Sequence, residues 1–113
     1  MVKNIVIIGA GGCARDTADI LDACNEDGQK YDVLGYVVDS KYGSPGTIIN
    51  DKPVLGDFQW LAKHAAKVFA ICAIGAPELR FHLVERSRRL GVRFCSAVHP
   101  DAKLTKWVTI GEV

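Results

Sequence analysis

Runs of consecutive apolar residues alternate along the chain with segments in which apolar residues recur every three or four positions. The first run, residues 2–8, is rich in β-branched side chains, as is typical of a buried strand in a parallel sheet. Between residues 12 and 25 the apolar positions recur with helical spacing, and Gly28 is a natural end for that helix. The chain therefore begins as a strand followed by a helix.

The same alternation continues to residue 98. Three further strands are predicted, at residues 33–38, 68–74 and 92–98. Pro77 suits the start of a helix over about 77–90, and Asp57 is placed to cap a shorter one. Residues 47–49 and 53–55 favour a small hairpin around Asn50-Asp51. Because strands and helices alternate, we predict an α/β domain over residues 1–98, with a four-stranded parallel sheet and flanking helices.

The loop GAGGCARD, residues 9–16, joins the first strand to the first helix. Gly9, Gly11 and Ala14 fit the G-x-G-x-x-G/A fingerprint of Rossmann-like domains. Glycines let the backbone approach an anionic ligand, and the start of the helix offers free N–H groups. Tight packing of a helix on a strand also selects small residues, but the position of the loop favours ligand binding. Cys13 is expected to be a small residue facing the helix rather than a nucleophile.

Two other segments end at the same edge of the predicted sheet. Asp39, with Ser40 beside it, follows the second long strand, where an acid in a Rossmann unit binds ribose hydroxyls. A simple turn is an equally good interpretation. Asp39 also comes later after the glycines than is usual in dinucleotide sites, which weakens the case for NAD in particular. Gly75 follows the next buried strand, and Arg80 lies on the first turn of the helix after it. Arg80 is placed either to reach a phosphate or to remain solvated.

Composition and charge argue against several classes of function. The net charge is +1, and the basic cluster of Arg86, Arg88 and Arg89 lacks interleaved aromatic residues, so we expect no nucleic-acid partner. The four cysteines have no C-x-x-C spacing, so we expect no metal site. No apolar run is long enough to span a membrane and no signal peptide is visible, so we expect a cytoplasmic protein with no membrane partner.

Histidine is the residue most often used for acid–base catalysis at neutral pH. The three histidines of this chain, His64, His82 and His99, are scattered, and no carboxylate is spaced to orient any of them. No Ser-His-Asp arrangement or carboxylate pair stands out. We therefore predict no catalytic residue in this sequence, and a binding role for the residues named above.

Five segments in order resemble one family: IVIIGAGGCARD, VLGYVVDS, PVLGD, AIGAPELR, and VHPDAKL followed by VTIGEV. Together they resemble the N-terminal domain of the NeuD/PglD-type sugar acyltransferases, and the resemblance covers the whole chain. It implies a Rossmann-like domain that binds the sugar substrate, often as a UDP-sugar. A left-handed β-helix domain would follow, which forms a homotrimer, binds acetyl-CoA between subunits and carries the histidine that acts as general base.

The resemblance also assigns roles to individual residues. The substrate-binding residues that it implies, together with their neighbours in the same loops, are Gly9, Ala10, Gly11, Gly12, Cys13, Asp39, Ser40, Gly75 and Arg80. The glycine loop would face the diphosphate or the sugar, Asp39 would lie near the nucleoside, and Gly75 with Arg80 would line the opposite wall. Two positions depart from the family pattern: Cys13 stands where histidine is usual, and Ala76-Pro77 where Asp-Asn is usual.

The last residues, 99–113, have a different pattern. VTIGEV has the composition of one hexapeptide turn of a left-handed β-helix, and a single turn cannot bury its apolar face alone. We therefore expect a sequence cut at the start of a second domain. The expected function is the substrate-binding domain of an acetyl-CoA-dependent sugar O- or N-acetyltransferase, inactive by itself. The alternative is a stand-alone NAD- or CoA-binding regulatory module. A dehydrogenase fragment would need a catalytic base and a substrate domain, and neither is visible.

Overall fold

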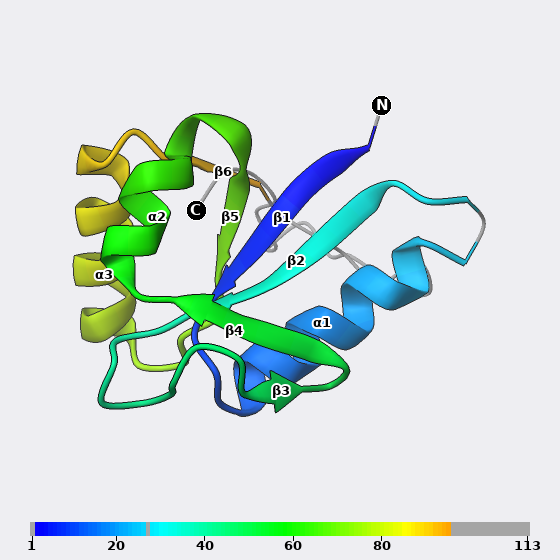
Figure 1. The fold of residues 1–113 in the computed structure, drawn as a ribbon, viewed down its shortest axis with the longest axis horizontal. Helices are drawn as coiled ribbons and strands as arrows, with labels where there is room; N and C mark the ends of the chain where they lie inside the picture. The colour runs from blue at the N-terminus through cyan, green and yellow to red at the C-terminus, as the bar shows by residue number, and fades with distance from the viewer. Residues whose placement is uncertain (1, 27, 96–113) are drawn as a thin grey trace, which may run out of the picture.

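The strands of this protein form one sheet in the order β3-β4-β2-β1-β5-β6 (Figure 1). The computed structural model describes residues 2–26 and 28–95. In chain order the elements are β1 (Lys3–Ile8), α1 (Gly12–Cys24), β2 (Tyr31–Val37), β3 (Ile48–Ile49), β4 (Lys52–Gly56), α2 (Phe58–His64), the 3-10 turn η1 (Ala65–Lys67), β5 (Phe69–Cys72), α3 (Pro77–Arg89) and β6 (Arg93–Phe94). The predicted α/β architecture is confirmed.

The sheet is larger than the four parallel strands that the sequence predicts. Strand β4 pairs in parallel with β2 and adds a fifth parallel strand, while β3 pairs antiparallel with β4 at the sheet edge. The hairpin predicted around Asn50-Asp51 is present, but it is part of the main sheet. The side chain of Val54 accounts for this position, because it is buried beside β2 in the same core cluster as Tyr36.

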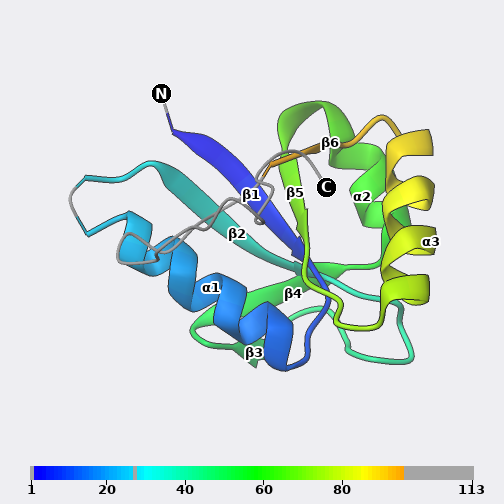
Figure 2. The same ribbon diagram turned by 180° about the vertical axis from the view of Figure 1, so that it is seen from behind.

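Two apolar clusters cover the two faces of the sheet. Alternate residues of β1 point to opposite sides: Ile5 and Ile7 pack under α1, and Val6 and Ile8 pack under α2 and α3. Figures 1 and 2 show α1 on one side of the sheet and the other two helices on the opposite side. This layering leaves the carboxyl ends of β1, β2 and β5 free at one edge.

The hairpin β3–β4 is tied to α1 by polar contacts. The ammonium of Lys52 lies 3.1 Å from both carboxylate oxygens of Asp22, and the amide of Asn50 donates to Asp19 Oδ1 at 3.4 Å. In Figure 2 the hairpin lies beside α1, which is drawn in blue. The segment between β2 and β3 is thereby held at both ends, next to the carboxyl edge of the sheet.

Some predictions fall outside the part of the chain that the structure describes. Strand β6 is described at Arg93–Phe94, whereas the predicted strand continues to residue 98. The predicted β-helix tail at 99–113, together with His99, lies wholly outside the described residues. Within the described residues, no helix combines the length and the apolar character needed to cross a membrane.

Candidate functional site

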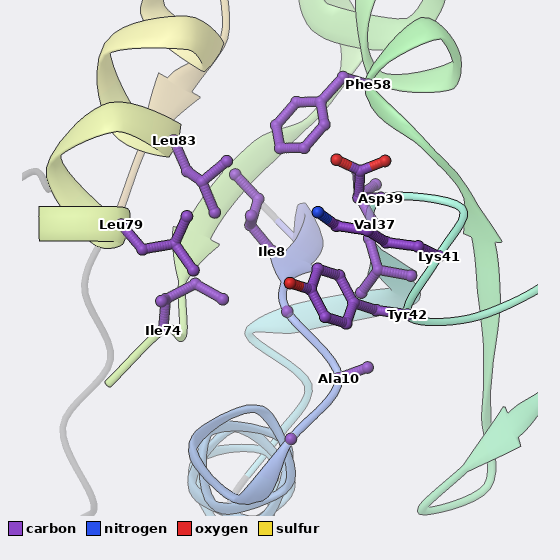
Figure 3. A pocket seen from close by; sticks show the side chains of 13 residues that line it. Ile8, Ala10, Val37, Asp39, Lys41, Tyr42, Phe58, Ile74, Leu79 and Leu83 are labelled. Carbon is purple, nitrogen blue, oxygen red and sulfur yellow. The ribbon is translucent and has the colours of Figure 1, made fainter. Parts of the chain in front are cut away.

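The carboxyl ends of β1 and β2 and the segment after β5 meet at a cavity of about 450 Å³ (Figure 3). Its floor and one side come from the two central strands and the glycine loop. Residues after β2 form a second side, and α2 and α3 supply the rest. The lining residues are Ile8, Gly9, Ala10, Gly11, Val37, Val38, Asp39, Lys41, Tyr42, Phe58, Ile74, Leu79 and Leu83.

The glycine loop has two positions where the absence of a side chain matters. Gly9 has a φ of +125°, and a Cβ there would lie 2.9 Å from the carbonyl oxygen of Ala73, so only glycine fits. Gly11 caps α1 in an extended conformation, and a Cβ added to it would have no neighbour within 4 Å. The space beside Gly11 is therefore open to a ligand.

Helix α1 begins at this loop without a negative charge to compensate its dipole. No side chain caps the helix, and its first turn contains no acidic residue. The free N–H groups at a helix start attract anions, and the helix dipole adds to that attraction. The arrangement can therefore receive a phosphate at the end of the cavity nearest Gly11.

Asp39, Lys41 and Tyr42 stand together on one side of the cavity (Figure 3). They belong to one turn, in which the amide of Tyr42 donates to the carbonyl oxygen of Asp39 at 2.9 Å. The ammonium of Lys41 lies 5.1 Å from the centroid of the Tyr42 ring, a cation–π contact. Within the described residues, neither Asp39 nor Lys41 forms an ion pair or a side-chain hydrogen bond.

The remaining walls are apolar. Ile8 and Phe58 are buried, while Leu79 at the start of α3 is exposed at the rim. Figure 3 shows Leu79 and Leu83 across the cavity from Lys41 and Tyr42. The cavity therefore has charged groups along one side and a surface on the other that suits rings and methyl groups.

The predicted site residues fall into three groups. Gly9, Ala10, Gly11 and Asp39 line the cavity. Ser40 instead lines a neighbouring hollow of about 300 Å³, which also includes Trp60 and Lys63. The remaining four, Gly12, Cys13, Gly75 and Arg80, are not among the residues that line either space.

Gly75 and Cys13 nevertheless lie close to each other at the start of α1. A side chain on Gly75 would meet the Sγ atom of Cys13 at 3.4 Å, so the loop after β5 approaches the first turn of that helix. Arg80 is exposed on α3, and its charge reaches the thiol of Cys72 at the end of β5. Gly12, Cys13 and Gly75 therefore meet at the start of α1, next to Gly11, whereas Arg80 lies on α3, and none of the four forms the cavity wall.

Sequence reasoning missed several of the residues that line the cavity. Lys41 and Tyr42 lie two and three residues after Asp39, so the turn that follows the second strand carries a signal for them. Phe58, Ile74 and Leu83 give no such signal, because they are apolar residues with the spacing of ordinary core positions. Only the packing of α2 and α3 against the sheet brings them to this cavity.

Three of the four described cysteines, Cys24, Cys72 and Cys95, are buried, and Cys13 is exposed on the first turn of α1. Burial raises the pKa of the Cys72 thiol, and a backbone hydrogen bond from Ile74 and the charge of Arg80 only partly offset this, so the thiol is not activated. His64 stacks on Trp60 with ring centroids 4.0 Å apart, and His82 meets the edge of Phe81. Neither histidine lines the cavity. Within the described residues, no group of three or more metal-binding side chains comes together.

Residues 4–87 match the model of the PglD N-terminal domain family. The chain belongs to this family. The resemblance to NeuD/PglD-type acyltransferases inferred from the sequence is therefore confirmed. A search of curated proteins gave no match.

Several solved structures share the fold. One is a mutant of perosamine N-acetyltransferase from Caulobacter crescentus in complex with CoA and GDP-perosamine, with 28% identity and a TM-score of 0.73. The alignment covers 91% of this chain and 46% of that one. Another is the acetyltransferase domain of PglB from Neisseria gonorrhoeae FA1090 in complex with acetyl coenzyme A, with 24% identity and a TM-score of 0.70. It covers 89% of this chain and 46% of that domain. The aligned part of this chain thus spans less than half of each of these two neighbours.

Proposed function

We propose that this chain is the part of a sugar O- or N-acetyltransferase that binds the acceptor as a nucleotide sugar. The observation that carries the proposal is a single cavity in which the glycine loop and Asp39 meet at the carboxyl edge of a parallel sheet. Family membership supports it, because the similar perosamine N-acetyltransferase was solved with a nucleotide sugar. The expected UDP-sugar stays a prediction, and the ligand of that neighbour is GDP-linked.

The diphosphate would lie against the glycine loop. Gly9 and Gly11 present backbone rather than side chains there, and Gly12 begins the helix whose free N–H groups attract anions. Asp39 would contact the nucleoside at the other side of the cavity. The proposed roles of Cys13, Ser40, Gly75 and Arg80 are contacts at the ends of the ligand, beyond the cavity wall.

The acetyl transfer itself would need groups that the described residues do not supply. A following β-helix domain would hold acetyl-CoA, form a homotrimer and provide a histidine that removes a proton from the sugar amine or hydroxyl. That oxygen or nitrogen would attack the carbonyl carbon of the thioester, with backbone donors holding the oxyanion. The carbon–sulfur bond would then break, and CoA would leave as a thiol with the proton that the histidine had taken. We propose that residues 1–98 bind the acceptor and carry out no transfer alone, and that the protein works in the cytoplasm.

The test is calorimetric titration with a UDP-sugar, a GDP-sugar, NAD and acetyl-CoA, using a matched pair of variants at Gly11. Asp and Asn are both good helix caps, so Gly11→Asp and Gly11→Asn should keep or raise thermal stability. The carboxylate of Gly11→Asp would repel a diphosphate at the helix start, whereas the amide would not. We expect Gly11→Asp to bind the nucleotide sugar at least about tenfold more weakly than Gly11→Asn.

Three results would contradict the proposal. One is a heat of binding with NAD and with no other ligand, which would favour the regulatory dinucleotide-binding module. Another is equal affinity of the two Gly11 variants for the nucleotide sugar, because it would mean that the diphosphate does not lie at the glycine loop. The third is no binding of either nucleotide sugar by the folded chain.

A further inference from the structure

The turn from Asp39 to Tyr42 carries three side chains of different chemistry into one side of the cavity. Asp39 and Lys41 are exposed charges without ion-pair partners in the described part of the chain. Tyr42 is 66% exposed although it is a large aromatic residue. Solvated side chains of this kind are ordinary on a surface, but here all three border the same cavity.

Each of the three groups can make one kind of contact with a planar ligand. A carboxylate only accepts hydrogen bonds, and an ammonium only donates them. A phenol ring offers a face on which a nucleobase stacks, and stacking of this kind accepts every base. A base stacked on Tyr42 would thus be held whatever its identity, whereas contacts to Asp39 and Lys41 would depend on the hydrogen-bonding groups of the base.

The pairing edges of the nucleobases differ in how they match a carboxylate and an ammonium on the same side of a cavity, as Asp39 and Lys41 are here. Guanine presents two adjacent donors, N1–H and the exocyclic amino group, beside the O6 acceptor. Uracil presents a single donor between two carbonyl oxygens, so one of them would face the carboxylate. Cytosine and adenine each offer only one donating group on this edge, with a ring nitrogen acceptor beside it. Guanine is the base whose donors and acceptor both find partners.

We propose that Asp39, Lys41 and Tyr42 form the base-binding side of the cavity and select guanine. Asp39 accepts from N1–H and the amino group, Lys41 donates to O6, and Tyr42 stacks on the ring. The inference rests on the proposed function, since it assumes a nucleotide ligand with its diphosphate at the glycine loop. It assigns roles to Lys41 and Tyr42, which sequence reasoning did not consider.

A competing role for Asp39 is a bond to the ribose hydroxyls, as in Rossmann dinucleotide sites. That role would hold every nucleotide equally, because the ribose is common to all of them. It would also make binding depend on the 2′-hydroxyl. Base selection by Asp39 predicts the opposite on both counts, so the two roles are separable by measurement.

The experiment measures the affinities of GDP, UDP, CDP and ADP for the folded chain by calorimetry, with dGDP and xanthosine diphosphate in parallel. We expect GDP to bind at least about tenfold more tightly than the other three common diphosphates. We also expect dGDP to bind as GDP does.

Variants at Asp39 test the base contact directly. Asp39→Asn should lose the preference for GDP and gain affinity for xanthosine diphosphate, because the amide can donate to the C2 carbonyl that replaces the amino group. Asp32→Asn is the matched control, since Asp32 is an exposed acid near the start of β2, at the end of that strand farther from the turn. It should leave all six affinities unchanged.

Variants at Lys41 and Tyr42 separate selection from stacking. Lys41→Met should narrow the difference in affinity between GDP and UDP, because it removes the proposed hydrogen bond to O6 of guanine. Tyr42→Ala should lower the affinity for every nucleotide by about tenfold, since stacking contributes to the binding of every base. Phe81→Ala is the matched control, because Phe81 is 65% exposed but does not line the cavity.

UDP binding as tightly as GDP would overturn the inference and leave the proposed function standing. The inference would also be overturned, in favour of the ribose role, if Asp39→Asn lost affinity equally for all nucleotides and if dGDP bound weakly. Absence of binding by every nucleotide would overturn both the inference and the proposed function.

Discussion

Gly35 decides how closely two neighbouring strands approach each other. It has a φ of +147°, and a Cβ there would collide with the carbonyl oxygen of Pro53 on β4. The β1–β2 pairing shifts its register beside this position, between Ile5 and Val6. A single missing side chain therefore permits β4 to join the sheet next to β2.

We expect Gly35→Ala to lower the free energy of unfolding by at least about 2 kcal/mol, because the new methyl group meets backbone at a strained φ. Gly12→Ala is the control: Gly12 is helical, its Cβ would meet nothing within 4 Å, and alanine favours helix. Urea denaturation of both variants checks this. A neutral Gly35→Ala would contradict the close approach of β2 and β4.

At the scale of the elements, the hairpin β3–β4 owes its turn to the two residues of its loop. Its two-residue loop, Asn50-Asp51, has φ values of 47° and 64°, as a type I′ turn requires. Asn and Asp tolerate this conformation better than most residues. The sequence predicts the hairpin from the segments 47–49 and 53–55 on either side of this loop, whereas its pairing with β2 depends on contacts distant in sequence.

The turn gives a second test at this scale. Asp51→Val should lower the free energy of unfolding by about 1–2 kcal/mol, because a β-branched residue strongly disfavours a positive φ. Asp51→Gly should not lower it. Thermal or urea denaturation of the two variants measures the difference, and equal stability would mean that the loop readily adopts another conformation.

At the scale of the whole molecule, the sheet is enclosed on both faces and holds ionisable groups in their neutral form. Burial raises the pKa of the Cys72 and Cys95 thiols above the ordinary value of 9.0. Burial, together with the nearby charges of Asp22 and Asp19, also raises the pKa of Tyr36. The folded state therefore keeps these protons to a higher pH than the unfolded chain does.

This enclosure predicts a loss of stability in alkaline solution. Above about pH 9 the unfolded thiols ionise while the folded ones stay protonated, so unfolding releases protons and becomes more favourable as the pH rises. The free energy of unfolding should therefore fall between pH 9 and pH 10, and each buried thiol should add to the fall. Urea midpoints at pH 7 and pH 10, in the presence of a reductant, measure it. Cys72→Ala should show a smaller fall than the wild type, and an identical fall would exclude Cys72 as a cause.

The sequence by itself determined the local features of this protein. The apolar runs, the helical spacing and the turn residues were sufficient for the order of strands and helices and for the hairpin. The glycine loop was recognisable because a backbone approach needs glycine at fixed positions along one segment. The five ordered motifs pointed to the family that the chain belongs to.

Only the tertiary structure decided which segments lie together. Strand β4 pairs with β2 through contacts that span the loop between them, and no local pattern encodes that choice. The cavity likewise draws on the glycine loop, the turn at Asp39–Tyr42, and helices α2 and α3. Its apolar lining looks like ordinary core in the sequence. Whether such a residue faces core or cavity depends on the strand order and helix packing, which are set by the burial of the whole sheet.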